Sequence, residues 1–519
     1  MRSKNNRSMQ LLSIICFVFF VQTLLTAADS EKVDWQGPAG SKIKGIRHFP
    51  DQTKPAESSP PSLTAAAFES TPAVISNVID SPPVDGFVPW IVLTATNKRL
   101  DDFTWNAEVE SSVIGSFPSG IDPAHDYFVG IFDTGASAHV IGYENAVQAG
   151  LFNSNYLTTN TIEVSGVTGS IEALVSKPYA LFMDGLDALE PNAVGQSEMI
   201  LSSTAGMIGE SNISTIIAND PGILPDLNTA IGTPMSVYYD TLIENDNMIT
   251  VTHNGNSYTG PRITFYDLDS QTPSFPNYVP LELRPLGAVD VQYIISLDLG
   301  GSDFLPATPS VIIGNSSQSL FFVHSVDLTE DGNIALDKDR FMLDTGAQVT
   351  VIGTRIAARL GLNPANMEFE VEIEGVTGDS IMAPGFYIDS ITIPAIGQWL
   401  EFTNIPVILL DISSPEGGTL DGIIGMNLFT QYNLILRGGG MFLDDDPVLE
   451  FERIQSLVAD IAPAVRDGKV NLIDLSAMSA VWLTANANAD IAPLGHPDGI
   501  VDLNDLMVLA DYWLEDINP

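Results

Sequence analysis

Residues 130–142, GIFDTGASAHVIG, recur almost unchanged as residues 341–353, FMLDTGAQVTVIG. The aspartate of the second copy, Asp344, follows the aspartate of the first, Asp133, by 211 residues. Both copies place apolar residues before Asp-Thr-Gly, and an alanine and then Val-Ile-Gly after it. One Asp-Thr-Gly predicts only a turn, whereas two copies in the same frame indicate a structural unit that occurs twice in the chain.

Two further features recur in the same order in both halves. A Gly-Val-Thr-Gly turn, flanked by alternating residues typical of a hairpin tip, stands at residues 166–169 and again at 375–378. A Gly-apolar-apolar-Gly segment then follows at residues 206–209 and at 422–425. Between them run short stretches of Val, Ile, Thr, Phe and Tyr, separated by turn residues. We therefore predict two duplicated, mostly-β lobes, which span residues 86–325 and 326–455.

Duplication has a chemical purpose if the two aspartates must meet. Two carboxyl groups that hold one water between them cannot both ionise cheaply, so the pair shares a proton and supplies a general base and a general acid together. A threonine hydroxyl beside each aspartate can bond across to the other loop, and glycine permits the tight turn. The residues with these supporting roles are expected to be Thr134, Gly135, Thr345 and Gly346, with Gly209 and Gly425 packed beneath the loops.

This constellation resembles the aspartic peptidases, the superfamily of pepsin and the retroviral proteases, over about 370 residues. The resemblance implies a mostly-β, bilobal pepsin-like fold with two pseudo-symmetric β-barrel lobes, although the lobe sequences are closer to the retroviral type. It also implies that Asp133 and Asp344 are the catalytic dyad, which hydrolyses a peptide or protein substrate without a cofactor. In pepsin-like proteins the hairpin of the N-terminal lobe forms the flap, which here implies Gly166, Val167, Thr168 and Gly169.

The sequence departs from the pepsin pattern directly after each Asp-Thr-Gly. Pepsins carry Ser or Thr there, and that hydroxyl stabilises the ionised carboxylate, whereas this chain carries Ala136 and Ala347. Because the loss of a donor to the charged form raises a carboxyl pKa, we expect activity at less acidic pH than pepsin's. Neither hairpin tip carries the tyrosine typical of the pepsin flap.

The N-terminal region and the composition predict a secreted protein. Residues 1–28 combine a basic start with a 15-residue apolar run and small residues for cleavage, as a signal peptide does. Residues 29–85 are rich in Pro, Ser, Ala and Lys, and predict either a linker or a pro-segment that is removed. The net charge of −44 makes nucleic acid an improbable partner. We expect a monomer that is extracellular, periplasmic or at the cell surface.

The last part of the chain, residues 456–519, contains a second repeat. The copies begin ADIAPAVRDG at residue 459 and ADIAPLGHPDG at residue 489. Each continues with carboxylates at the spacing of an EF-hand-type loop and then with apolar residues at helical spacing. Two such units resemble a type I dockerin, which implies a small α-helical, EF-hand-like domain, bound calcium and a cohesin-like protein partner. The expected calcium ligands are Asp460, Asp467, Asn471, Asp474, Asp490, Asp498, Asp502 and Asp505. The simpler alternative is a pair of helices that caps the chain.

Three functions therefore stay open on the sequence. The first is a secreted aspartic endopeptidase with a calcium-binding docking module. The second is a catalytically inactive pepsin-fold protein that binds peptides or serves in adhesion, displayed through the dockerin-like module. The third is a peptidase that cleaves only its own precursor or one partner. Cleavage that is lost on replacing one aspartate separates the enzymes from the binding protein.

Overall fold

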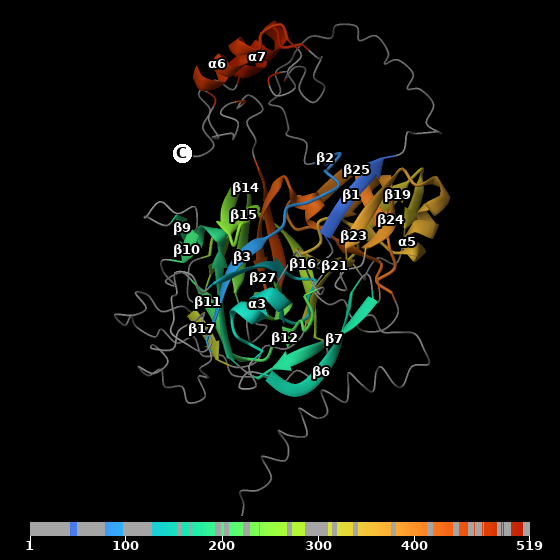
Figure 1. Ribbon diagram of the computed structural model, residues 1–519. Coiled ribbons are helices and arrows are strands. Elements are labelled where there is room, and N and C mark those ends of the chain that lie inside the picture. Colours follow the sequence, from blue (N-terminus) through green and yellow to red (C-terminus); the bar gives the residue numbers. More distant parts are fainter. Residues whose placement is uncertain are drawn as a thin grey trace, which may run out of the picture. The chain divides into compact units, whose positions relative to one another are not determined.

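We analysed a computed structural model of the chain, which forms two compact units, Met1–Glu452 and Arg453–Pro519 (Figure 1). Each unit is described by itself. The structure describes residues 42–48, 78–96, 127–152, 157–166, 169–177, 179–191, 199–201, 207–221, 229–237, 239–266, 272–285, 310–313, 319–335, 341–374, 380–412, 419–439, 446–454, 461, 470, 472–484, 489, 491 and 500–511.

The first unit is mostly β, as the sequence predicts, and its N-terminal part forms a ten-stranded sheet. The strands in order across this sheet are β17 (Ser310–Ile313), β11 (Ile208–Ile213), β8 (Tyr179–Gly185), β3 (Trp90–Thr96), β4 (Phe128–Asp133), β13 (Thr229–Gly232), β5 (Val140–Ile141), β12 (Ile216–Ile217), β7 (Gly169–Ser176) and β6 (Leu157–Gly166). A separate pair consists of β9 (Leu189–Pro191) and β10 (Met199–Leu201).

A second sheet of sixteen strands contains the C-terminal half of the unit. Its main path is β1 (Lys42–His48), β23 (Phe369–Glu374), β24 (Ser380–Ile393), β25 (Leu400–Leu409), β22 (Val351–Ile352), β26 (Gly422–Ile424), β21 (Phe341–Leu343), β18 (Ser319–Val323), β16 (Asn277–Pro285), β28 (Val448–Arg453), β27 (Tyr432–Arg437), β14 (Asp240–His253) and β15 (Asn256–Tyr266). Off this path lie β2 (Val78–Asp80), β19 (Asp327–Glu330) and β20 (Asn333–Ala335).

The helices of the first unit are short, and two of them repeat the duplication seen in the sequence. Helix α3 (Tyr143–Gln148) begins after Gly142, and helix α5 (Thr354–Leu360) begins after Gly353, so each Val-Ile-Gly leads from a strand into a helix. The other helices among the described residues of this unit are α4 (Thr233–Ser236) and the 3₁₀ helices η1 (Leu186–Ala188), η2 (Pro364–Asn366) and η3 (Met426–Phe429). Both copies of the motif thus occupy a strand–turn–strand–helix unit.

The region predicted as a linker or pro-segment, residues 29–85, contributes two strands to the second sheet. Strand β1 pairs antiparallel with β23, and β2 pairs parallel with β25. After β2, the backbone N–H of Gly86 donates to the Gln348 carbonyl at 2.7 Å. A Cβ at Gly86 would lie 2.3 Å from the backbone N of Asn427, so the chain passes too close for any side chain. Residues 78–86 are therefore an integral part of the second lobe.

The two predicted lobes also share strands across the expected boundary at residue 325. Strands β16 and β18, which the sequence assigned to the first lobe, pair with β28 and with β21. Strand β14 likewise pairs with β27, close to the end of the unit. One apolar core contains residues of both sheets, such as Phe132 and Phe265, whose rings meet edge to face at 5.6 Å between centroids. The lobes are thus joined by continuous backbone pairing.

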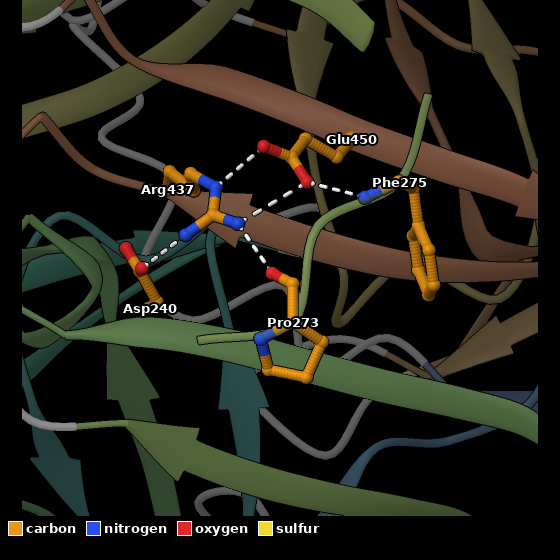
Figure 2. A network of polar contacts seen from close by, with 5 residues as sticks. All are labelled: Asp240, Pro273, Phe275, Arg437 and Glu450. Carbon is orange, nitrogen blue, oxygen red and sulfur yellow. Dashed lines mark hydrogen bonds and ion pairs between the residues drawn. The ribbon is translucent and has the colours of Figure 1, made fainter. Parts of the chain in front are cut away.

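A polar network centred on Arg437 fastens these shared strands together (Figure 2). The Nε of Arg437 donates to Oε1 of Glu450 at 2.6 Å, and its two terminal nitrogens reach Asp240 and the Pro273 carbonyl. Glu450 also accepts the backbone N–H of Phe275 at 2.8 Å. A single guanidinium thereby connects β14, β27, β28 and the segment that leads into β16.

We expect Arg437→Met to lower the free energy of unfolding by about 2–3 kcal/mol, because it leaves two carboxylates without their cation. Only 11% of the Glu450 side chain and 27% of the Asp240 side chain are exposed. The matched control is Arg262→Met, since Arg262 is 40% exposed and pairs with Asp187, which is 32% exposed, and more distantly, at 3.6 Å, with Glu244, which is 24% exposed. There we expect a loss below about 1 kcal/mol. Urea denaturation of both variants checks the difference, and equal losses would contradict the role of the network.

The second unit, Arg453–Pro519, contains helices α6 (Leu472–Ala480) and α7 (Leu503–Asp511). Its own small apolar core includes Val470, Met478, Ile491, Val501 and Leu509. Each helix begins shortly after the Asp-Gly of one sequence repeat, so the repeat corresponds to one helix per copy. Among the described residues, no helix of either unit is long and apolar enough to cross a membrane.

Candidate active site

The two Asp-Thr-Gly turns follow equivalent strands of the two sheets. Asp133 is the last residue of β4, and β13 runs parallel to β4 and antiparallel to β5. Asp344 follows β21 directly, and β26 runs parallel to β21 and antiparallel to β22. In both lobes a central strand is therefore enclosed by the two strands that the turn connects.

The two threonines bind the turns to each other through four buried hydrogen bonds. The backbone N–H of Thr134 donates to Oγ1 of Thr345 at 3.0 Å, and the reciprocal bond is also 3.0 Å. Each hydroxyl then donates to the carbonyl that precedes the opposite aspartate. Thr134 reaches Leu343 at 2.9 Å, and Thr345 reaches Phe132 at 2.7 Å. The backbone N–H and the hydroxyl of each threonine are thus bound to the opposite lobe.

Both carboxyl groups are fully buried, and each is oriented by its own turn. The Oδ1 atom of each aspartate accepts two backbone N–H groups. The donors are Gly135 (2.9 Å) and Ala136 (3.2 Å) for Asp133, and Gly346 (2.9 Å) and Ala347 (3.1 Å) for Asp344. No side-chain hydroxyl is available at residues 136 and 347, so backbone amides supply these donors.

The glycine of each turn lets the opposite carboxyl group approach. A Cβ at Gly135 would lie 2.3 Å from Cγ of Asp344, and a Cβ at Gly346 would lie 2.6 Å from Cγ of Asp133. Side chains do not tolerate such distances, so any other residue would push the carboxyl groups apart. The close approach of the two backbone turns therefore brings the two aspartates together.

Burial and pairing change the acidity of this site. The pKa of Asp344 is raised well above its usual range, first because burial disfavours the carboxylate and then because of the charge of Asp133 and the hydrogen bond with it. The N–H groups of Gly346 and Ala347 oppose this shift. A carboxyl group in this setting keeps its proton at pH values where an exposed one has lost it. The pair can therefore hold one proton and one negative charge together.

The segment beneath the second turn lies where the sequence predicts it, but its counterpart in the first lobe is a different glycine. A Cβ at Gly425 would lie 2.6 Å from the Val349 carbonyl carbon, and the next N–H, of Met426, donates to the Ala347 carbonyl at 2.8 Å. In the first lobe Gly232 takes this place, because its Cβ would lie 2.3 Å from the Ala136 carbonyl oxygen.

The prediction for Gly209 therefore has to be corrected. Gly209 lies in β11, between β8 and β17, and a Cβ there would meet the ring of Phe182 at 2.2 Å. The motif at residues 206–209 marks close packing in that strand and does not support the dyad. The true counterpart, TAIG at residues 229–232, has two apolar residues before the glycine but no leading glycine.

Two side chains that the sequence did not single out complete the first-lobe turn. Thr233 donates from Oγ1 to the Thr134 carbonyl at 2.6 Å. His139 accepts the Gly232 N–H at Nδ1, at 2.9 Å. Thr350 occupies the equivalent place in the second lobe and accepts the Gly425 N–H at 3.3 Å. Alignment of the two motif copies pairs His139 with Thr350 and is the signal that could have found this role.

The candidate flap is present as a hairpin whose tip lies outside the described residues. Strands β6 and β7 pair antiparallel up to Gly166 and Gly169. Val167 and Thr168, between them, are not among the described residues, and neither is the second tip at 375–378. The hairpin stem therefore agrees with the expected position, while its tip stays a prediction.

Three of the eight predicted calcium ligands lie in the described part of the second unit. Asp474 and Asp505 are fully buried near the start of α6 and α7, and their Oδ1 atoms accept the N–H of Ile461 (2.9 Å) and of Ile491 (2.5 Å). The N–H of Asp502 donates to Oδ2 of Asp505 at 2.7 Å. Outside the described residues lie Asp460, Asp467, Asn471, Asp490 and Asp498. Within those that are described, no three metal-binding side chains gather.

One comparison with known proteins, a family match, covers the second turn of this site. Residues 331–428 match the model of a family described as aspartyl protease, and this range includes Asp344, Thr345, Gly346 and Gly425. Among solved structures, the chain is similar to conglutin gamma, a basic 7S globulin from lupine seeds. The identity is 10%, the TM-score 0.29, and the match covers 71% of this chain and 96% of the other. No curated protein matches. The chain thus contains an aspartyl protease-like domain.

Proposed function

We propose that the protein is a secreted aspartic endopeptidase in which Asp133 and Asp344 activate a water molecule between them. The observation that carries the proposal is the reciprocal bonding of the two turns, in which each threonine hydroxyl bridges to the opposite lobe. Such bonding serves no purpose in either lobe alone, but it holds two buried carboxyl groups against each other. The family match of residues 331–428 supports the same activity for the second turn.

The proposed reaction begins with one proton shared by the pair, and the steps are written with that proton on Asp344. Ionised Asp133 accepts a proton from water as the water oxygen attacks the peptide carbonyl carbon, and Asp344 donates its proton to the carbonyl oxygen. The tetrahedral diol then collapses. Asp133 gives its proton to the amide nitrogen as the C–N bond breaks, and Asp344 recovers a proton from one hydroxyl. An acid and an amine leave, and no covalent intermediate forms.

The test is cleavage of an unstructured protein between pH 3 and 7, with the Asp344→Asn chain beside it. A peptide that carries a secondary alcohol in place of the scissile carbonyl should inhibit, because it resembles the tetrahedral diol. We expect the optimum to lie above that of pepsin, since Ala136 and Ala347 supply no hydroxyl donor. Cleavage of the chain itself, with no cleavage of other substrates, would favour the peptidase that acts only on its own precursor or on one partner. No cleavage of either would favour the peptide-binding protein.

For the second unit we propose calcium binding and a cohesin-like partner. The support is the repeated arrangement of Asp474 and Asp505, each buried near the start of its helix in the place of the last EF-hand carboxylate. Isothermal titration of the full chain after chelation should show two calcium ions. Asp474→Ala and Asp505→Ala should each remove one, because one repeat then lacks its closing carboxylate. Unchanged binding in both variants would contradict the role of these two aspartates, and no calcium binding to the unmodified chain would leave the helical pair as a cap of the chain.

A further inference from the structure

Strand β23 belongs to the hairpin of the second lobe, and its outer edge is occupied by a segment from the far N-terminal region. Strand β24 pairs with one side of β23, and β1 pairs with the other. Without β1 this edge would present a row of unpaired backbone groups, which is a template for adding a strand from another peptide. The occupant, residues 42–48, is followed in the described part of the chain by residue 78, after an interval of 29 residues (49–77).

The composition of β1 is unusual for this protein. The chain has 21 Lys and Arg against 65 Asp and Glu, yet three of those 21 fall within the seven residues KIKGIRH. Strand β23, FEVEIE, carries three glutamates in six residues. Opposite charges on neighbouring strands stabilise their pairing, whereas like charges weaken it. Charge thus favours the pairing of β23 with this segment over its pairing with an acidic segment of the chain.

The register places the charges and the apolar residues in matching positions. Arg47 stands opposite Glu370, and Lys42 opposite Glu374. The two isoleucines of β1, at 43 and 46, stand opposite Ile373 and Val371, respectively. Residues opposite each other in a ladder lie on the same face of the sheet.

The two faces of β23 differ in burial in a way that fits this register. Val371 and Ile373 are buried in the core of the second lobe, whereas Glu370 and Glu372 are only partly buried. A strand added at this edge therefore meets an apolar face and an acidic face. Strand β1 matches both faces through a shift in the pairing between Ile43 and Gly45, which brings both of its isoleucines opposite apolar residues of β23.

We propose that the outer edge of β23 is a docking site for an extended segment of basic and apolar residues, which residues 42–48 of this chain fill. Because the backbone ladder joins the segment to β23 and the two strands carry residues of opposite charge, we expect the segment to stay bound after the chain is cut between residues 49 and 77. It leaves when a stronger basic strand competes or when salt screens the charges. The inference is independent of the proposed peptidase activity.

The test uses the chain with a protease recognition sequence inserted after residue 60, in an Asp344→Asn background so that the proposed activity plays no part. After cutting, we expect the N-terminal fragment to elute with the body in size-exclusion chromatography at low salt and to separate from it at 1 M NaCl. A synthetic peptide of residues 42–48 should displace the fragment. The same peptide with K42E and R47E should displace it at least about tenfold less well.

Charge reversal in the body provides the matched comparison. E370K with E374K reverses the charges opposite Arg47 and Lys42 and should release the fragment at low salt, and K42E with R47E in the same chain should restore its retention. The control, E144K with E190K, reverses the charge of two exposed glutamates on α3 and β9, and this variant should retain the N-terminal fragment. Release of the unmodified fragment at low salt would overturn the proposal. So would equal displacement by both peptides, which needs no charge variant of the body and is informative even if E370K with E374K fails to fold.

Discussion

Replacing Asp344 by asparagine is expected to lower kcat for peptide cleavage by about a thousandfold or more. Asparagine is close to the same size and can still accept the Gly346 and Ala347 N–H groups at its carbonyl oxygen. It cannot exchange a proton, however. No group then protonates the carbonyl oxygen of the substrate during water attack, and none accepts a proton from the diol when it collapses. Asp133→Asn should have the same effect, because the turns make equivalent contacts in the two lobes.

The same variant should be at least as stable as the unmodified protein, and its advantage should grow as the pH rises. Because the pKa of Asp344 is raised in the folded protein, the folded state binds this proton more tightly than the unfolded state does. Stability from this group is therefore full at low pH and is lost as the pH increases through the folded pKa. Asparagine, which does not ionise, escapes this loss.

Activity and melting temperature should be measured together at several pH values. The control is Asp389→Asn, which changes an exposed aspartate of β24 far along the chain from the turn. It should leave cleavage unchanged. Residual activity of the Asp344→Asn chain above about a tenth of the original would mean that another group performs the proton transfer.

The sequence was informative where local chemistry alone defines a position. An Asp-Thr-Gly turn that faces a copy of itself needs a threonine hydroxyl to bond across and a glycine to let the opposite carboxyl group approach. Thr134 and Gly135 were therefore predictable, together with Thr345 and Gly346. The supporting glycine was harder to place. Gly209 and Gly232 both lie in strands after apolar residues, and only the strand order, with β13 beside β4, distinguishes them.

The N-terminal region shows a different limit. Residues 42–48 and 78–80 are too short and too isolated for their periodicity to predict strands, since their partners lie more than 300 residues further along the chain. What makes them strands is the edge of a sheet that only the folded second lobe provides. The charge match between residues 42–48 and 369–374 was visible in the sequence, but it has meaning only once the register is known.

Thr134→Val and Thr345→Val are each expected to cost about 2–4 kcal/mol of folding free energy, because each leaves a buried N–H and a buried carbonyl without a partner. Valine keeps the shape of threonine, so packing is preserved. The carboxyl groups lose their alignment when the turns relax, and a shift of about 1 Å lowers kcat by about a hundredfold. KM should change little, since neither hydroxyl faces substrate.

A double-mutant cycle of these variants should show a coupling of about 1 kcal/mol or more, since the first substitution already loosens the turn that the second threonine holds. Thr241→Val is the matched control. Thr241 is also fully buried, and its hydroxyl has no hydrogen-bond partner among the described residues. Its replacement should therefore leave stability and kcat nearly unchanged. Losses at Thr134 and Thr345 no larger than at Thr241, or strictly additive ones, would show that the two turns are held together by packing alone.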